Sequence, residues 1–251
     1  MFRNILLPII ITLFVFCTSN NDIQVIGHRG AMGHALENTL ESVKKAIALK
    51  ADGIEIDVFK TKSGDLVVYH DSILSRLSNS NAFIEEISLD SIKKIQLING
   101  SSIPTLNEVI DLIPDDIFLN IELKGKNTAY KTNETILQYI NQKNLKIDKF
   151  IISSFRWDEL EKFRSLNDKV KIAILVDSFH KIQSSLILSQ KINAYALNPN
   201  NKFLSKEIVQ KIKSKNLLVF PYTVNTKDSI EIMKSFGIDG IITDYPERVN
   251  N

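Results

Sequence analysis

Residues 23 to 58 read IQVIGHRGAMGHALENTLESVKKAIALKADGIEIDV, and this stretch decides the fold class. It begins with a β-branched strand pattern, continues with apolar residues at helical spacing, and closes with a second strand pattern, GIEIDV. A strand, a helix and a strand in this order are typical of a βα unit in a parallel sheet. The helix is expected to start at Asn38, with Glu41 three residues further on completing a capping-box pattern.

The same alternation continues along the chain. Strand candidates begin near residues 23, 53, 117, 150, 171, 193, 217 and 240. Eight repeats favour a closed (β/α)8 barrel over an open doubly wound sheet, and no GxGxxG follows the first strand. The interval 59–116 is about twice as long as the others and contains a predicted hairpin turning at Ser63-Gly64, then a helix near Thr105 to Leu112. We therefore predict that residues 21–251 form a TIM barrel with a small insertion between strands 2 and 3.

Composition limits the classes of partner. Of 251 residues, 44% are apolar and 24% charged, which is typical of a globular chain with a large core. The 31 basic and 29 acidic residues are scattered, so no basic face for nucleic acid is expected. A small anionic substrate remains compatible, because it needs only one or two well-placed cations.

The amino-terminal residues have the pattern of an export signal. Arg3 precedes thirteen residues, Ile5 to Cys17, that carry no charge. This run is shorter than the roughly 20 residues that span a bilayer and matches the apolar region of a signal peptide. We predict that residues 1–20 are a signal peptide and that the protein is exported; the alternative is an N-terminal strand or core helix.

Cys17 is the only cysteine and lies where the apolar run meets a polar one. This placement resembles a bacterial lipoprotein signal, in which the cysteine is lipidated, although Phe16 stands where small residues are usual. Three outcomes therefore stay open: a membrane-anchored lipoprotein, a cleaved periplasmic protein and a retained anchor.

Three acidic residues stand on strand patterns. Glu55 and Asp57 are two apart, so they share one face of their strand, and Glu122 in NIELK interrupts another strand in the same way. Carboxylates inside a barrel are costly unless a cation neutralises them; a strand with one solvated face is the alternative. We expect Glu122 to face the pair across the barrel mouth. An all-oxygen site without cysteine favours Ca²⁺ or Mg²⁺ over Zn²⁺.

Two of the four histidines stand at predicted strand ends. His28 ends the first strand and His70 ends the hairpin strand. Two histidines above a carboxylate cluster are typical of an acid/base pair that works near neutral pH. His34 and His180 lie in loop or helix-start contexts, and we interpret them as incidental.

Seven short motifs stand in order between residues 28 and 225. They are HRG at 28–30, ENT at 37–39, GIEIDV at 53–58, HD at 70–71, IPTL at 103–106, NIELK at 120–124 and TVN at 223–225. Together they resemble the glycerophosphodiester phosphodiesterase family. The resemblance implies a barrel enzyme that hydrolyses a small-molecule glycerophosphodiester to glycerol 3-phosphate and an alcohol, with one divalent cation as cofactor.

The resemblance also assigns roles by matching motif. It implies that His28 and His70 are the catalytic acid/base pair, and that Glu55, Asp57 and Glu122 are the metal ligands.

Three further residues are implied to bind substrate. Arg29 and Lys124 would hold the phosphate. Three carboxylates and one divalent cation have a net charge of minus one, and these two side chains would raise it to plus one. For Lys124, the alternative is a solvated position at the surface. Tyr222 stands where many family members have tryptophan before TVN, so we retain it as a substrate contact.

Two alternative functions remain. One is a related barrel phosphodiesterase with the same metal and histidines that acts on lysophospholipids. The other is a catalytically silent, surface-binding lipoprotein on the same scaffold.

Overall fold

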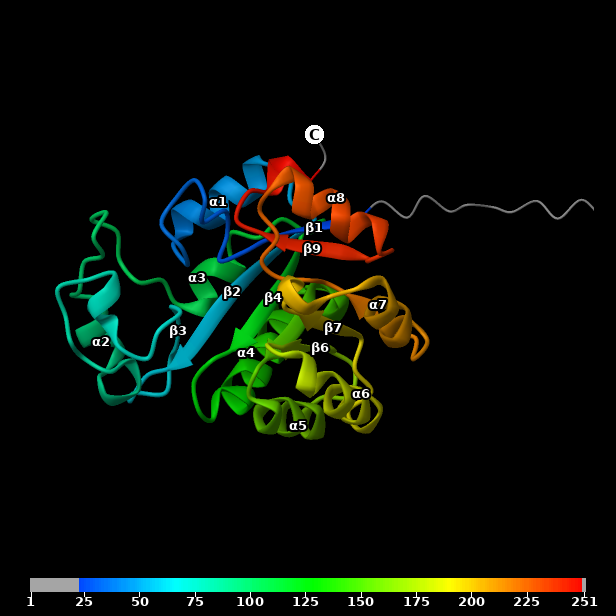
Figure 1. Cartoon of the computed structure of the whole chain (residues 1–251). Coiled ribbons are helices and arrows are strands. Elements are labelled where there is room, and N and C mark those ends of the chain that lie inside the picture. Colours follow the sequence, from blue (N-terminus) through cyan, green and yellow to red (C-terminus); the bar gives the residue numbers. More distant parts are fainter. Residues whose placement is uncertain (1–22, 250–251) are drawn as a thin grey trace, which may run out of the picture.

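Eight parallel strands form the wall of a barrel in the computed structural model, which describes residues 23–249 (Figure 1). In chain order they are β1 (Gln24–Gly27), β2 (Gly53–Lys60), β4 (Phe118–Leu123), β5 (Phe150–Ser154), β6 (Lys171–Val176), β7 (Ala196–Pro199), β8 (Leu218–Val219) and β9 (Gly240–Thr243). Their order in the sheet is β8-β7-β6-β5-β4-β2-β1-β9. The N–H groups of Asp239 and Ile242 donate to the carbonyls of Val219 and Pro221, at 3.1 and 3.0 Å. The sheet therefore nearly closes, which confirms the predicted (β/α)8 barrel.

Helices alternate with the strands and cover the outside of the barrel. They are α1 (Leu40–Ala48), α4 (Thr128–Lys143), α5 (Trp157–Leu166), α6 (Ile182–Lys191), α7 (Lys206–Lys213) and α8 (Lys227–Ser235). Short 3-10 turns precede β5, α6 and α7 and follow β9: η3 (Ile147–Lys149), η4 (Phe179–Lys181), η5 (Asn201–Phe203) and η6 (Pro246–Arg248). Buried side chains such as Val43, Ile54 and Phe163 fill the layer between helices and sheet.

The start of α1 differs from the prediction by one residue. Its N-cap is Thr39, whose side chain accepts a hydrogen bond from the Ser42 N–H, and Ser42 rather than Glu41 completes the capping box. Asn38 instead has a φ of 56° and binds Asp57. Asparagine and threonine both cap helices, but asparagine enters the left-handed region more readily, and its long-range partner was not visible in the sequence.

The predicted insertion lies between β2 and β4. It contains β3 (Leu66–Val68), which pairs antiparallel with β2, and the helical segments η1 (Leu74–Arg76), η2 (Ile84–Glu86), α2 (Leu89–Ile92) and α3 (Leu106–Ile110). The hairpin turns at Gly64, with a φ of +95°, as predicted. A second apolar cluster that includes Tyr69, Ile84 and Ile103 stabilises the insertion, which stands to one side of the barrel (Figure 1).

The barrel interior has an apolar layer and a polar layer. Ile26, Ala173 and Phe220 belong to the apolar cluster. Strand register places Asp57 beside Glu122, and Glu122 beside Ser153, toward the carboxyl ends of β2, β4 and β5. Barrel enzymes carry their active sites at this end.

Within residues 23–249, no helix combines the length and the apolar character needed to cross a membrane. The predicted signal peptide and Cys17 lie outside the described residues.

Candidate active site

Glu55 and Asp57 of β2 and Glu122 of β4 form a buried acidic cluster. One carboxylate oxygen of each lies within 4.8 Å of the others. Burial, followed by the charges of Asp57 and Glu122, raises the pKa of Glu55 well above its ordinary value; burial and Asp57 raise the pKa of Glu122 to about 8. The nearby Lys124 and Arg29 therefore do not fully offset the negative charge of the cluster, and its all-oxygen donors fit a hard divalent cation. Glu122 lies beside Asp57 on the neighbouring strand, so the expected placement across the barrel mouth was wrong.

The loop after β1 holds two of these carboxylates in place. The Arg29 N–H donates to Glu55 at 2.9 Å, and the Asn38 side-chain amide donates to Asp57 at 2.8 Å. Arg29 and Gly30 have φ values of 49° and 87°. A Cβ on Gly30 would lie 2.4 Å from the Ser42 hydroxyl, so glycine is needed for both conformation and space.

His28 lies at the end of β1 and lines the cavity. Its Nδ1 lies 2.7 Å from Asp244, and the second carboxylate oxygen of Asp244 accepts a hydrogen bond from Asn225 at 2.6 Å. Burial alone would raise the pKa of Asp244, but the hydrogen bonds from His28 and Asn225 hold it below its ordinary value. Sequence reasoning missed Asp244, although it stands at the end of the strand candidate GIITD.

His70 follows β3, on the insertion. Its Nδ1 lies 2.5 Å from Asp71 and its Nε2 lies 3.1 Å from the Lys124 ammonium. Because an ammonium only donates hydrogen bonds, Nε2 is assigned as the acceptor and Nδ1 as the protonated nitrogen. Burial, together with the charges of Arg29 and Lys124, lowers the pKa of His70. These surroundings favour the neutral form of the ring.

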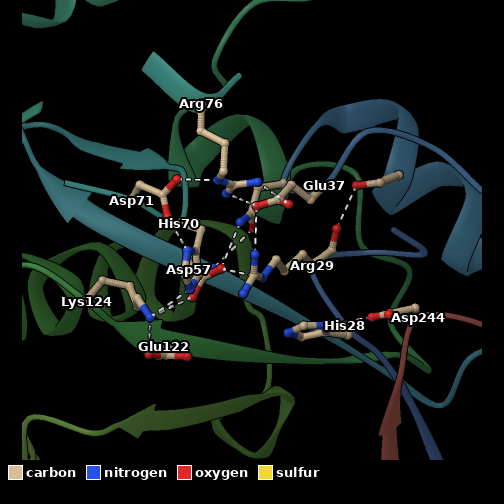
Figure 2. Close-up of polar contacts among 12 residues, drawn as sticks. His28, Arg29, Glu37, Asp57, His70, Asp71, Arg76, Glu122, Lys124 and Asp244 are labelled. Carbon is tan, nitrogen blue, oxygen red and sulfur yellow. Dashed lines mark hydrogen bonds and ion pairs between the residues drawn. The ribbon is translucent and has the colours of Figure 1, made fainter. Parts of the chain in front are cut away.

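The two predicted phosphate-binding cations also lie at this site (Figure 2). Lys124 Nζ lies 3.0 Å from Glu122 and 3.8 Å from Asp57. The Arg29 guanidinium donates to Glu37 at 2.8 Å, and its Nε lies 3.3 Å from Asp57. Glu37, although part of the ENT motif, had no predicted role.

The cavity has a volume of about 270 Å³, and part of its wall is apolar. Phe155, Leu175 and Tyr222 belong to this wall, and the rings of Phe155 and Tyr222 meet edge to face with centroids 5.7 Å apart. The predicted site residues that line the cavity are His28, Arg29, Glu55, His70, Glu122, Lys124 and Tyr222.

Asp57, buried behind Arg29 and Asn38, completes the predicted set. His34 pairs with Glu247, and neither it nor His180 is among the lining residues, which agrees with their interpretation as incidental.

A (β/α)8 barrel that carries an acidic cluster suited to a cation and two histidines paired with carboxylates at its carboxyl end has the arrangement of an enzyme active site. A model of the glycerophosphoryl diester phosphodiesterase family matches residues 28–248. The chain belongs to this family and is an enzyme.

Individual relatives agree with this assignment. A glycerophosphodiester phosphodiesterase of Caldanaerobacter subterraneus subsp. tengcongensis is 36% identical over 241 residues, covering 90% of this chain and 96% of the relative. The glycerophosphodiester phosphodiesterase structure from Thermotoga maritima has a TM-score of 0.75 at 31% identity, covering 90% of this chain and 96% of its own. A phosphodiesterase of Oleispira antarctica, solved in complex with the product sn-glycerol-3-phosphate, has a TM-score of 0.81 at 26% identity, covering 90% and 95%.

Proposed function

We propose that the enzyme hydrolyses glycerophosphodiesters to glycerol 3-phosphate and an alcohol, with one divalent cation, Ca²⁺ or Mg²⁺. The observation that carries the proposal is one cavity that combines His28, His70 and the acidic cluster. The family and the product named for the Oleispira antarctica structure support the substrate class.

Glu55, Asp57 and Glu122 would hold the cation. The raised pKa values of Glu55 and Glu122 support this assignment, because buried carboxylates whose charge is only partly offset gain most from a bound positive charge. When bound, the cation would supply positive charge for the phosphate and acidify a neighbouring hydroxyl. Arg29 and Lys124 would add the charge that an anionic diester needs.

The chemical step would be an attack by the substrate's own glycerol 2-hydroxyl, which is better placed than water. The hydroxyl oxygen forms a bond to phosphorus as the bond from phosphorus to the departing alcohol breaks, giving a cyclic phosphate. His70, neutral and with a lowered pKa, would take the hydroxyl proton. His28, the other histidine at the cavity, would protonate the departing alcohol while Asp244 holds its Nδ1. Water would then open the ring with the two roles exchanged.

Tyr222 and Phe155 would contact the carbon skeleton of the substrate. Tyr222 is fixed by a hydrogen bond from its hydroxyl to the Val176 carbonyl at 3.2 Å, so its ring presents a stable apolar surface.

A panel of glycerophosphodiesters, assayed by coupled detection of glycerol 3-phosphate in Ca²⁺ and in Mg²⁺, tests the proposal. We expect choline to be released faster from glycerophosphocholine than from lysophosphatidylcholine, whose cleavage gives no glycerol 3-phosphate, and the reverse order would support the lysophospholipid alternative. A substrate lacking the 2-hydroxyl should bind but hardly react, and phosphorus NMR should detect cyclic glycerol phosphate. Cleavage of the deoxy substrate at a comparable rate would show that water attacks directly.

We also propose that residues 1–20 direct export and that Cys17 is lipidated, anchoring the enzyme to a membrane. The basis is the uncharged run from Ile5 to Cys17. Fractionation of cells that produce the wild type or Cys17→Ser should find the wild type with membranes and the variant in the soluble periplasmic fraction. An unprocessed wild-type chain in the cytoplasm would contradict both claims.

A further inference from the structure

Arg76 joins the insertion to the loop after β1. Its Nη1 and Nη2 donate to the two carboxylate oxygens of Glu37 at 2.9 and 2.7 Å. Its Nε donates to Asp71. The guanidinium thus contacts two carboxylates that belong to different parts of the chain, and it stands between them in Figure 2.

Each of these two carboxylates also contacts a residue of the candidate active site. Glu37 also accepts a hydrogen bond from Arg29 Nη1 at 2.8 Å, and Asp71 holds Nδ1 of His70. Arg76 is therefore one residue removed from both a proposed phosphate ligand and a proposed base.

Glu37 lies between two cations, Arg76 and Arg29, and this arrangement affects how strongly Glu37 neutralises Arg29. Glu37 is 6% exposed, so its charge is poorly screened and acts on whichever cation is nearest. Burial would raise the pKa of Glu37, but hydrogen bonds from Arg76 and the charge of Arg29 hold it below its ordinary value. With Arg76 present, Glu37 divides its hydrogen bonds between two guanidinium groups. Glu37 therefore neutralises Arg29 less completely, and more of the positive charge of Arg29 can act on a phosphate.

We infer that Arg76 is a positioning residue with two effects. It orients His70 through Asp71, and it offsets part of the charge of Glu37, so that Glu37 neutralises Arg29 less. The inference rests on the proposed function, since it assigns Arg76 a part in the same reaction. The planar Arg76 guanidinium donates two hydrogen bonds to Glu37 and a third to Asp71, so it can hold both carboxylates at fixed angles. A lysine ammonium lacks this planar set of donors.

The test separates two sets of contacts, the Arg76–Asp71–His70 arm and the Arg76–Glu37–Arg29 arm. The variants are Arg76→Gln, Asp71→Asn, Glu37→Gln and the two double variants that combine Arg76→Gln with one of the others. We follow kcat, and the dissociation constant of glycerol 3-phosphate by calorimetry on the Ca²⁺-loaded protein. Loss of a supporting partner typically costs ~10–100-fold, and we expect that loss in kcat/KM for Arg76→Gln, with a lower kcat and weaker product binding. The kcat effect should vanish on the Asp71→Asn background, and the binding effect on the Glu37→Gln background.

The matched control is Lys93→Gln. Lys93 is another cation of the insertion, and within it donates to the Ile103 carbonyl and to Glu108, at 3.0 and 2.6 Å. Circular dichroism should show all variants folded, and Lys93→Gln should keep wild-type kcat and binding. Equal losses in Lys93→Gln would mean that general loosening of the insertion explains the effect, which overturns the inference. Full recovery in Arg76→Lys would overturn it as well, because charge alone would then suffice.

A readout without turnover separates this inference from the proposed function. Nitrogen NMR of the His70 ring should show a protonated Nδ1 in the wild type and a mixture of tautomers in Arg76→Gln. An unchanged tautomer together with unchanged product binding overturns the role of Arg76. A wild type that turns over no glycerophosphodiester overturns the proposed function instead, and the NMR comparison still decides the Arg76–Asp71–His70 arm.

Discussion

His28 and His70 come from different elements, yet each has a carboxylate at Nδ1, provided by Asp244 and Asp71. A carboxylate in this position fixes the ring orientation and leaves Nε2 for the reaction. The surroundings of the two rings differ, because the Lys124 ammonium lies 3.1 Å from Nε2 of His70.

We predict that His28→Ala and His70→Ala each lower kcat by the ~10²–10⁴-fold that accompanies loss of a positioned acid or base. His180→Ala is the matched control, because His180 is exposed and lies in η4, away from the cavity. Steady-state kinetics and circular dichroism on the same samples measure the effect. Near-wild-type turnover in either site variant removes that histidine from the mechanism.

The pH profile should reflect the environment of His70. Burial and the nearby charges of Arg29 and Lys124 lower its pKa below the ordinary 6.5, so the ring loses its proton at a lower pH and stays neutral across a wider range. As a base it is active when neutral, so kcat/KM should fall on the acid side with a midpoint below pH 6.5. An acid-side midpoint above pH 7 contradicts this assignment.

At the scale of elements, α4 begins in an unusual way. Asn127, its N-cap, has a φ of 55° and makes no side-chain capping bond. Glu159 of α5 accepts the N–H groups of Asn127 and Ala129 at 2.9 and 3.0 Å, and Lys162 pairs with it. A neighbouring helix therefore caps α4, three residues after Lys124 enters the site.

Glu159→Ala should lower the free energy of unfolding by about 2 kcal/mol, because it leaves the Asn127 N–H and the buried Ala129 N–H at the start of α4 without this acceptor. The control is Glu161→Ala, a carboxylate 41% exposed that pairs with Lys191, for which we expect less than about 1 kcal/mol. Urea unfolding of both variants measures the difference. Equal losses in the free energy of unfolding would show that capping of α4 by Glu159 contributes no more than an exposed ion pair.

At the scale of the whole molecule, a bound cation should stabilise the barrel. Its ligands come from β2 and β4, so the site exists only when the sheet is assembled, and a cation at 100 times its Kd would add ~2.7 kcal/mol. We expect Ca²⁺ or Mg²⁺ to raise Tm and chelation to abolish activity. Glu122→Gln should reduce the rise, whereas Asp115→Asn, which removes a carboxylate 96% exposed, should not. Full activity after exhaustive dialysis against EDTA contradicts the cation requirement.

The sequence by itself determined the barrel and most of the site residues. Strand and helix periods are local, so each of the eight strand patterns could be recognised without knowing its neighbours. Glu55, Asp57 and Glu122 stood out because charges on otherwise apolar strands conflict with burial. Parallel strands bring their carboxyl ends together, so residues that follow a strand pattern, such as His28, were expected to converge.

Only the tertiary structure decided which partners these residues have. His28 and Asp244 are 216 residues apart, and Arg76 and Glu37 are 39 apart. Asn38, in the loop before α1, was mistaken for a helix cap because its partner Asp57 lies 19 residues further on, in β2. A hydrogen bond depends on distances and angles between atoms, and these are set by how strand ends and the insertion meet after folding, which no local pattern encodes.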